Sequence, residues 1–408
     1  MTSLPNAPLG RRQFLSLGTT VATATGAGLS ASEATARSSH KGPWIPSREF
    51  LDYLPQLMEV VSLPGLAMAV VEGGKVVWTH AAGLMHVESR TPMQVDSVFE
   101  CASLNKPVFA YVVMKLADEK RIDLDRPLVQ YLRPAFLSQH PDVDVITAKH
   151  VLSHTTGFPN WRPNPEEKLT PAFKPGSRFG YSGEGMHWLQ LVVEQITGGG
   201  VEIVMRNRLF EPANMPLSTM GWNTTIANLS VYGYQGPGDG EGTLGPQYIR
   251  DEGNRMLALA SKFDKPISEL TDAEVRRVLP TGKSLADVAG TMKTTVTEYA
   301  RFMALMMERP RRASWEISET SRQAMLRQQV TRKPNALYWG LGWGIEQNPI
   351  GRLFYHDGNN YNLFITFALG DPARRRAIVI FTNGGGGGNV YERIVRSATG
   401  QDLFSCMR

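Results

Sequence analysis

The stretch "ECASLNKPVF", residues 100–109, sets a serine three residues before a lysine and a proline directly after it. Residues three apart on a helix share one face, so Ser103 and Lys106 are expected to lie within reach of each other. Pro107 is compatible with a helix only in its first turn, which predicts that a helix begins near Ser103. A hydroxyl would then lie at the amide-rich start of the helix, with an amine one turn further on. We interpret the pair as a candidate nucleophile and its activator.

The spacing alone is weak evidence, because Ser38 and Lys41 repeat it in an expected linker where no element could position them. A serine hydroxyl is a poor nucleophile until a base takes its proton. The helix that follows Ser103 differs from that linker, since "VFAYVVMKLADE" is apolar on nearly all sides. Such a pattern predicts a buried helix, which would hold the lysine in a fixed place.

The elements around this helix follow from the hydrophobic periodicity. "REFLDYLPQLMEVV", beyond Pro46, has a helical rhythm, and "GLAMAVVEGGKVVWTHAAGLMHV" predicts two strands joined at Glu72-Gly73-Gly74. From about 130 to 285 the pattern indicates helices between loops rich in proline and glycine. The last hundred residues predict an antiparallel meander of four short strands, "LYWGLGWGIEQ", "GRLFYHDG", "YNLFITFALG" and "RRAIVIFTN", and then a final helix.

Strands at both ends of the chain and helices between them predict an α/β fold of the α+β type. The economical arrangement pairs the early hairpin with the late meander in one antiparallel sheet, with the first and last helices on one face. The expected α/β lobe covers about 46–100 and 286–408, and a helical lobe covers about 101–285. Ser103 would then lie at the seam between them, where pockets tend to form.

The composition is that of an ordinary globular protein, with 408 residues, 42% hydrophobic and 20% charged. The net charge of +5 is a weak bias for this length, and we interpret the basic cluster Arg374–Arg376 as a solvated loop. We therefore expect no nucleic-acid partner. Two cysteines exclude a paired-cysteine metal site, and the histidines lack a metal-binding spacing, so we expect no metal and no cofactor. A disulfide between Cys101 and Cys406 stays open.

The N-terminal stretch "LGRRQFLSLGTTVATATGAGLSASEATARSSH" has the three parts of an export signal. Arg11-Arg12 resembles the twin-arginine type, a mild apolar region follows, and Ala34-Thr35-Ala36 supplies small residues for cleavage. The apolar region is too short and too polar for a comfortable membrane span. We expect a signal peptide over 1–36, a linker over 37–45 and a catalytic domain over 46–408. The mature protein is expected to be periplasmic or secreted, without a stable membrane span.

The segment around Ser103 resembles the nucleophile segment of serine β-lactamases and their relatives, especially class C enzymes, DD-peptidases and β-lactamase-fold esterases. Further segments resemble this family in the same order: "VLSHTTGFPNW", "FKPGSRFGYSGEGMHWLQ", "ADVAGTMKTTVTEYARFM", and the closing strands with "WGLGWGI", "YHDGNN" and "VIFTNGGGG". The similarity runs from about 50 to 400 and is weakest over 226–284. Several ordered matches are far more specific than any single motif.

The resemblance implies a role for each matched residue. Ser103 would be the acylated nucleophile, Lys106 its activator and Tyr181 a general base or acid; which of the last two takes the serine proton stays open. His356, Asp357 and Gly358 would replace the family's Lys-Thr-Gly strand and line the substrate site. The oxyanion hole would consist of the backbone amides of Ser103 and Asn359.

Two departures from the family pattern bear on activity. The family's Tyr-x-Asn motif reads Tyr181-Ser182-Gly183, so an amide that usually holds the lysine and the substrate is missing. Glu184 is a candidate to replace it, and Gly183 and Glu184 are both expected at the substrate site. His356 replaces a lysine that attracts a substrate carboxylate, and histidine is mostly neutral above its usual pKa of about 6.5. Asp357 adds repulsion, so the grip on an anionic β-lactam should be weak.

These observations predict an exported serine hydrolase that acts through a Ser103 acyl-enzyme. Its small-molecule substrate would be an ester, a D-amino-acid peptide or amide, or a β-lactam. The alternative is a catalytically silent binding protein of the same fold, and the missing asparagine is its main support. An α/β-hydrolase esterase is excluded, because no G-x-S-x-G motif occurs in the expected mature chain.

Overall fold

The computed structural model describes residues 42–407 except 165, 237–245, 266–268, 278–285, 309, 311–312 and 349–350. The predicted signal peptide, 1–36, and the first part of the predicted linker, 37–41, lie outside the described residues. The described residues belong to one compact unit, Ser39–Arg408. Within them, no helix combines the length and the apolarity that crossing a bilayer requires.

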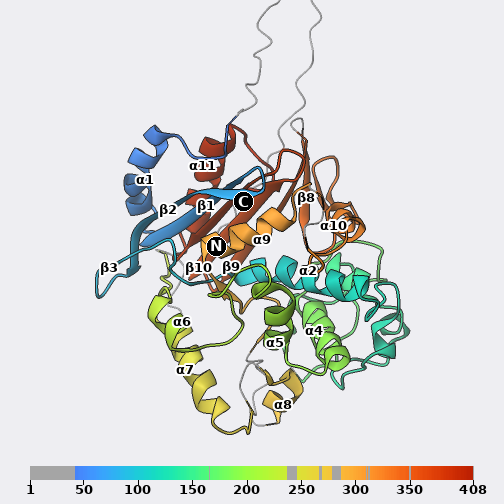
Figure 1. Ribbon diagram of the computed structural model, residues 1–408. Helices are drawn as coiled ribbons and strands as arrows, with labels where there is room; N and C mark the ends of the chain where they lie inside the picture. Colours follow the sequence, from blue (N-terminus) through green and yellow to red (C-terminus); the bar gives the residue numbers. More distant parts are fainter. Residues whose placement is uncertain are drawn as a thin grey trace, which may run out of the picture. The chain divides into compact units, whose positions relative to one another are not determined.

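A nine-stranded antiparallel sheet runs through this unit in the order β3-β2-β1-β11-β10-β9-β8-β7-β6 (Figure 1). The strands are β1 (Gly65–Glu72), β2 (Lys75–His86), β3 (Thr91–Pro92), β6 (Val330–Lys333), β7 (Leu337–Trp339), β8 (Gly344–Asn348), β9 (Gly351–Asn360), β10 (Phe364–Asp371) and β11 (Arg376–Thr382). Strand β1 pairs with β11, from Leu66 opposite Thr382 to Val71 opposite Ala377. The early hairpin and the late meander therefore share one sheet, which confirms the predicted fold class.

The central strands are buried on both faces, because alternate side chains of a strand point to opposite sides. In β1, Leu66, Met68 and Val70 belong to one hydrophobic cluster, and Ala67 and Ala69 belong to another. The first cluster includes residues of α1 (Arg48–Val60) and α11 (Gly387–Thr399), so the first and last helices cover one face as predicted. The second cluster includes α2 (Asn105–Asp118), α9 (Val296–Leu305) and α10 (Glu319–Leu326) on the other face.

The ends of the described chain are anchored in the first of these clusters. Trp44 is buried there, so the folded part starts slightly before the expected boundary at Pro46. Near the other end, the buried Glu346 carboxylate of β8 accepts hydrogen bonds from the backbone amides of Phe404 (3.2 Å) and Ser405 (2.9 Å). Both termini of the described segment are thus held by burial or by charge-assisted hydrogen bonds.

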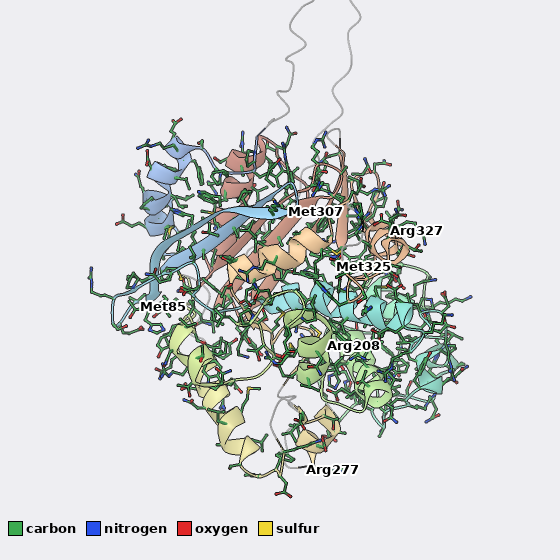
Figure 2. All side chains as sticks on the ribbon, viewed as in Figure 1. Met85, Arg208, Arg277, Met307, Met325 and Arg327 are labelled. Atoms are coloured by element: carbon green, nitrogen blue, oxygen red, sulfur yellow. The ribbon has the colours of Figure 1, made fainter. Side chains whose placement is uncertain are left out.

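Helices and short turns make up most of the region between residues 102 and 276. They are η1 (Ala102–Leu104), η2 (Leu128–Gln130), η3 (Pro141–Val143), α3 (Ala148–Leu152), α4 (Gly183–Thr197), α5 (Val201–Met205), η4 (Arg206–Phe210), α6 (Thr224–Leu229), α7 (Tyr248–Ala260) and α8 (Asp272–Arg276). Helix α4 ends at Gly198, whose φ of 77° is the left-handed cap expected there. Arg208 of η4 reaches Glu119, just beyond α2, with 3.6 Å between Nη2 and Oε2 (Figure 2).

The two cysteines are both buried and free in the structure. The disulfide that the sequence left open is therefore not formed. Burial raises the pKa of both thiols, so Cys101 and Cys406 behave as small apolar side chains.

Candidate active site

Ser103 lies in a short helical turn, η1, that continues directly into α2 at Asn105. The helix was predicted to begin near Ser103, and Pro107 indeed falls in the first turn of α2. Ala102, just before the serine, has a φ of 51°, a left-handed conformation that is unusual for a residue with a Cβ. The hydroxyl of Thr366 in β10 donates to the carbonyl of Cys101 (2.9 Å), which ties this turn to the sheet.

The amine of Lys106 is held by two acceptors. Its Nζ donates to Ser103 Oγ (3.0 Å) and to the backbone carbonyl of Ala289 (2.5 Å). The same nitrogen lies 4.9 Å from the centre of the Tyr181 ring. The lysine side chain is buried, so the nitrogen is fixed beside the serine oxygen rather than free in solvent.

Burial lowers the pKa of Lys106 to about 7, and the carboxylates of Asp287 and Asp357 oppose this effect. A group buried in apolar surroundings disfavours its charged form, here the ammonium ion. Near neutral pH much of the lysine is therefore an uncharged amine, with a lone pair that can take a proton from Ser103.

Tyr181 also faces the serine, since the Ser103 side chain is close enough to lower the pKa of the phenol. Burial raises the pKa of Tyr181, and the carboxylate of Asp357 raises it further. The phenol is therefore protonated at neutral pH. Burial is the largest of the effects on this pKa.

Tyr181 is part of an aromatic wall, which we define as His154, Phe179, Tyr181, Trp339 and His356. The ring centres of His154 lie 4.2 Å from Tyr181 and 5.1 Å from Trp339, and Trp339 lies 5.3 Å from His356. Nδ1 of His154 accepts a hydrogen bond from the Ser182 amide (3.1 Å). This hydrogen bond fixes the segment that carries Tyr181.

His356 contributes an uncharged ring to the wall. Its Nδ1 donates to the carbonyl of Asp357 (2.7 Å), while its buried Nε2 has no hydrogen-bond partner among the described residues. Burial lowers the pKa of His356 to about 4, so the ring is neutral at neutral pH. It does not supply the positive charge that a lysine at this position would bring.

Gly358 lets strand β9 approach the nucleophile turn. A Cβ at this position would lie 2.3 Å from Thr366 Oγ1 and 3.0 Å from the Cβ of Ala102, which is too close for any side chain. The next residue, Asn359, pairs its side chain with Asn362 in the turn between β9 and β10 (2.7 Å and 2.8 Å). Strand β9, which carries Asn359, thus packs against η1, the turn that carries Ser103.

The two residues at the start of α4 have other partners. Glu184 accepts from the backbone and the guanidinium of Arg162 (both 2.9 Å), so its carboxylate does not replace the missing asparagine. Gly183 packs beneath Trp161, and a Cβ there would lie 2.7 Å from two atoms of the indole ring. The backbone carbonyl of Ala289, rather than a side chain, gives the Lys106 amine its second acceptor.

Ser103, Lys106, Tyr181 and His356 thus come together, with Gly358 and Asn359 beside them on β9, whereas Glu184 is engaged by Arg162. Sequence reasoning missed Ala289, because a backbone carbonyl leaves no mark on residue type. It also missed Trp161, although the unexpected glycine at 183 was an indirect signal. Among the described residues, no group of three or more His, Cys, Asp or Glu side chains is arranged to hold a metal ion.

Comparisons with known proteins agree with this geometry. Residues 50–399 match the Beta-lactamase family model. The chain is 22% identical over 310 residues to "Penicillin-binding protein 4*" of Bacillus subtilis, covering 70% of this chain and 61% of that protein. It is 33% identical over 101 residues to "Esterase EstB" of Burkholderia gladioli, covering 24% of this chain and 26% of the esterase. The alignments therefore span less than two thirds of either relative.

Solved structures show the same fold. A beta-lactamase/D-alanine carboxypeptidase from Pseudomonas syringae superposes with a TM-score of 0.66 at 16% identity, covering 85% of this chain and 96% of that one. A class C beta lactamase from Rhodobacter sphaeroides gives a TM-score of 0.64 at 15% identity, covering 88% and 99%. Fold, order of segments and family match all lead to one conclusion: this chain is a member of the beta-lactamase family.

Proposed function

We propose that the protein is an exported serine hydrolase that forms an acyl-enzyme on Ser103. The observation that carries the proposal is that the Lys106 amine lies 3.0 Å from Ser103 Oγ and 4.9 Å from the centre of the Tyr181 ring, so that amine, hydroxyl and phenol share one site. A nucleophile within hydrogen-bond reach of its base, with the base held by a third group, is the arrangement that nucleophilic catalysis requires.

Lys106 is the better candidate for the base. Its pKa of about 7 makes the free amine abundant at neutral pH, whereas the raised pKa of Tyr181 keeps the phenol protonated. A base works best when its pKa lies near the working pH. Tyr181 then acts as a proton donor and relay between Ser103, the leaving group and the incoming water.

The reaction then proceeds in two balanced steps. As Ser103 Oγ attacks the substrate carbonyl, its proton passes to the Lys106 amine, and the oxyanion is stabilised by the amides of Ser103 and Asn359. The alkoxide leaves with a proton delivered through Tyr181, and the acyl group stays on the serine. A water molecule then attacks the acyl-enzyme, and its proton passes by the same route to the Ser103 oxygen as the acyl–Oγ bond breaks. The carboxylic acid is released and the serine hydroxyl is restored.

The charges around the serine favour a neutral ester over an anionic β-lactam. His356 is uncharged, and the carboxylates of Asp287 and Asp357 are close enough to raise the pKa of Lys106. A substrate carboxylate would meet these negative charges without the lysine that normally balances them. The relative named as an esterase is consistent with this preference, although it matches over only a quarter of this chain.

A labelling experiment tests the proposal directly. Purified protein is incubated with a fluorescent fluorophosphonate, and we expect one labelled band that Ser103→Ala abolishes. A panel of p-nitrophenyl esters, a D-alanyl peptide and a chromogenic cephalosporin then ranks the substrates, with ester turnover expected to exceed cephalosporin turnover. A well-folded wild-type protein that neither labels nor turns over any substrate would favour the silent binding protein instead.

Export is the other part of the proposal. The twin-arginine pair Arg11-Arg12, the apolar region and the small residues before residue 37 support it. Replacing both arginines with lysine should retain the precursor inside the cell, and a wild-type precursor that stays uncleaved in the cytoplasm would contradict it. N-terminal sequencing of the exported protein should find cleavage near Ala36.

A further inference from the structure

Two buried titratable side chains, Glu100 and Lys293, lie on the two-stranded ladder next to the nucleophile turn. Strand β4 (Phe99–Glu100) pairs with β5 (Lys293–Thr294), and this register sets Glu100 directly opposite Lys293. Both side chains are buried, with 6% and 4% of their surface exposed. Glu100 lies only three residues before Ser103, so whatever fixes Glu100 also fixes the approach to the nucleophile.

Asn360 joins this pair to the end of strand β9. Its Nδ2 donates to the carbonyl of Gly290 (3.0 Å), and its side chain is close enough to Glu100 to lower the pKa of that carboxyl, against the larger opposing effect of burial. We call Glu100, Lys293 and Asn360 the polar junction. Asn360 directly follows Asn359, and the next two residues, Tyr361 and Asn362, both have a φ of 56°. Such left-handed backbone at non-glycine residues persists only where its surroundings hold it.

The polar junction connects three segments that carry the candidate catalytic groups. Glu100 leads to Ser103, Gly290 follows the Ala289 carbonyl that holds Lys106, and Asn360 follows the predicted oxyanion donor Asn359. A fixed distance between these segments is what an oxyanion hole needs, because its donors must be aimed at the developing charge beforehand.

The polar junction costs free energy of folding, because Glu100 and Lys293 are buried. One carboxylate oxygen of Glu100, Oε2, is buried without a hydrogen-bond partner among the described residues. An unsatisfied buried oxygen in a native structure calls for a reason other than stability. The position of these residues between the three catalytic segments supplies such a reason.

We propose that Glu100 and Asn360 are positioning residues that hold the Asn359 amide in the oxyanion hole. The proposal rests on the proposed function. Glu100 also has coulombic interactions with other titratable groups. They are Lys293 across the ladder, Cys101 beside it, Glu252 from α7 and Tyr361 from the β9–β10 turn. Helix α7, from the part of the chain that resembles the family least, thus approaches the site through Glu252.

Asn360→Ala is the main test, because this half-buried side chain can be shortened without leaving a buried charge alone. We expect kcat for a neutral p-nitrophenyl ester to fall about 10- to 100-fold, less than the cost of about 10²- to 10³-fold for losing an oxyanion donor outright, because the Asn359 amide is misaligned rather than removed. KM should change less than about threefold, because the ground-state contacts stay. The isosteric Glu100→Gln should give a smaller loss in the same direction, as the amide keeps an oxygen beside Asn360.

A boronic acid gives a readout that a structural role would not move. Its tetrahedral adduct with Ser103 imitates the transition state, so its inhibition constant should rise by the same factor by which kcat/KM falls in Asn360→Ala. The affinity for the carboxylic acid product should stay near the wild-type value. Equal weakening of both ligands would overturn the proposal.

Glu346→Gln is the matched control, since it neutralises another buried carboxylate that holds the chain end near Phe404 and Ser405. It should lower the melting temperature but leave the kcat of the folded protein unchanged. If Asn360→Ala behaves like this control, the junction is only structural and the inference fails. An inert wild-type enzyme would instead mean that the proposed function itself is wrong, which the Ser103 labelling experiment decides separately.

Discussion

Two contrasting sets of residues meet at the Lys106 amine. The aromatic wall shields the nitrogen on the Tyr181 side, and the loop with Asp287 and Ala289, next to the polar junction, supplies a carbonyl and a negative charge. The wall favours the free amine by excluding water, whereas the carboxylates favour the ammonium ion. Their balance sets the pKa of about 7, so the base is tuned by the difference between two surroundings rather than by one partner.

The largest effect is expected from removing the amine itself. Lys106→Met should lower kcat/KM for a neutral ester by about 10³-fold or more, since both the base and its hydrogen bond to Ser103 are lost. Lys106 has a pKa of about 7 in the folded state and an ordinary lysine pKa when unfolded, so its contribution to stability rises with pH between about 7 and 10.5. Lys106→Met should remove this contribution and match or exceed the wild-type melting temperature at pH 7. Activity within tenfold of wild type would remove lysine from the mechanism.

The second change removes the hydroxyl group of Tyr181 but keeps its ring in the aromatic wall. Tyr181→Phe keeps the packing against His154 and Trp339 but loses the hydroxyl that faces Ser103. We expect kcat to fall about 10²-fold, within the range typical of a placed proton donor, with a nearly unchanged melting temperature. A loss as large as that of Lys106→Met would indicate that Tyr181, and not Lys106, takes the serine proton.

The third prediction concerns the family's missing asparagine. Gly183→Asn should destabilise the protein by about 1–3 kcal/mol, because the new side chain collides with the indole of Trp161. Trp161 is 50% exposed, so Trp161→Ala should be nearly neutral alone and should restore part of the loss in the double variant. Urea unfolding of the four proteins measures this coupling. Purely additive effects would show that Trp161 does not exclude the asparagine.

The smallest effect is expected from neutralising Asp287, one of the carboxylates beside the Lys106 amine. Asp287 raises the pKa of Lys106, so Asp287→Asn should lower that pKa while keeping an oxygen for the Ala289 amide. The acid limb of the kcat/KM profile, expected near pH 7 in the wild type, should move to lower pH by less than about one unit. Asp371→Asn, which changes a carboxylate bonded to Arg374 in a remote turn, should not move it. A shift to higher pH would contradict the assignment of this limb to Lys106.

Much of the fold could be predicted from the sequence because it follows from local patterns. The hairpin at Gly73-Gly74 and the closing meander follow from short apolar runs between turn residues, and the buried helix after Ser103 follows from a stretch that is apolar on nearly all sides. The pairing of the early hairpin with the late meander could also be expected, because apolar strands at both ends of the chain must be buried and can be buried together in one sheet. The pairing of Glu100 with Lys293 could not be predicted, since each short strand has two residues and no period.

The residues of the candidate site likewise divide into those that the sequence could predict and those that it could not. The spacing of Ser103 and Lys106 is a property of one helix, so the sequence reveals it. Tyr181 and Asn359 come from distant segments, and only the family resemblance indicated them. The Ala289 carbonyl was invisible because every residue carries one. The effect of burial on the Tyr181 pKa was missed because it depends on the complete surroundings of the phenol rather than on its nearest charge.

The backbone conformation of Ala102 is expected to favour catalysis at the expense of thermal stability. Its left-handed backbone costs about 1–2 kcal/mol in a residue with a side chain, and its methyl group rests against the bare strand at Gly358. Directed evolution for heat resistance should therefore select glycine at this position, since glycine relaxes the backbone there. The same change would give more freedom to the peptide that leads into Ser103. The variants with the highest melting temperatures should therefore be among those with the lowest kcat.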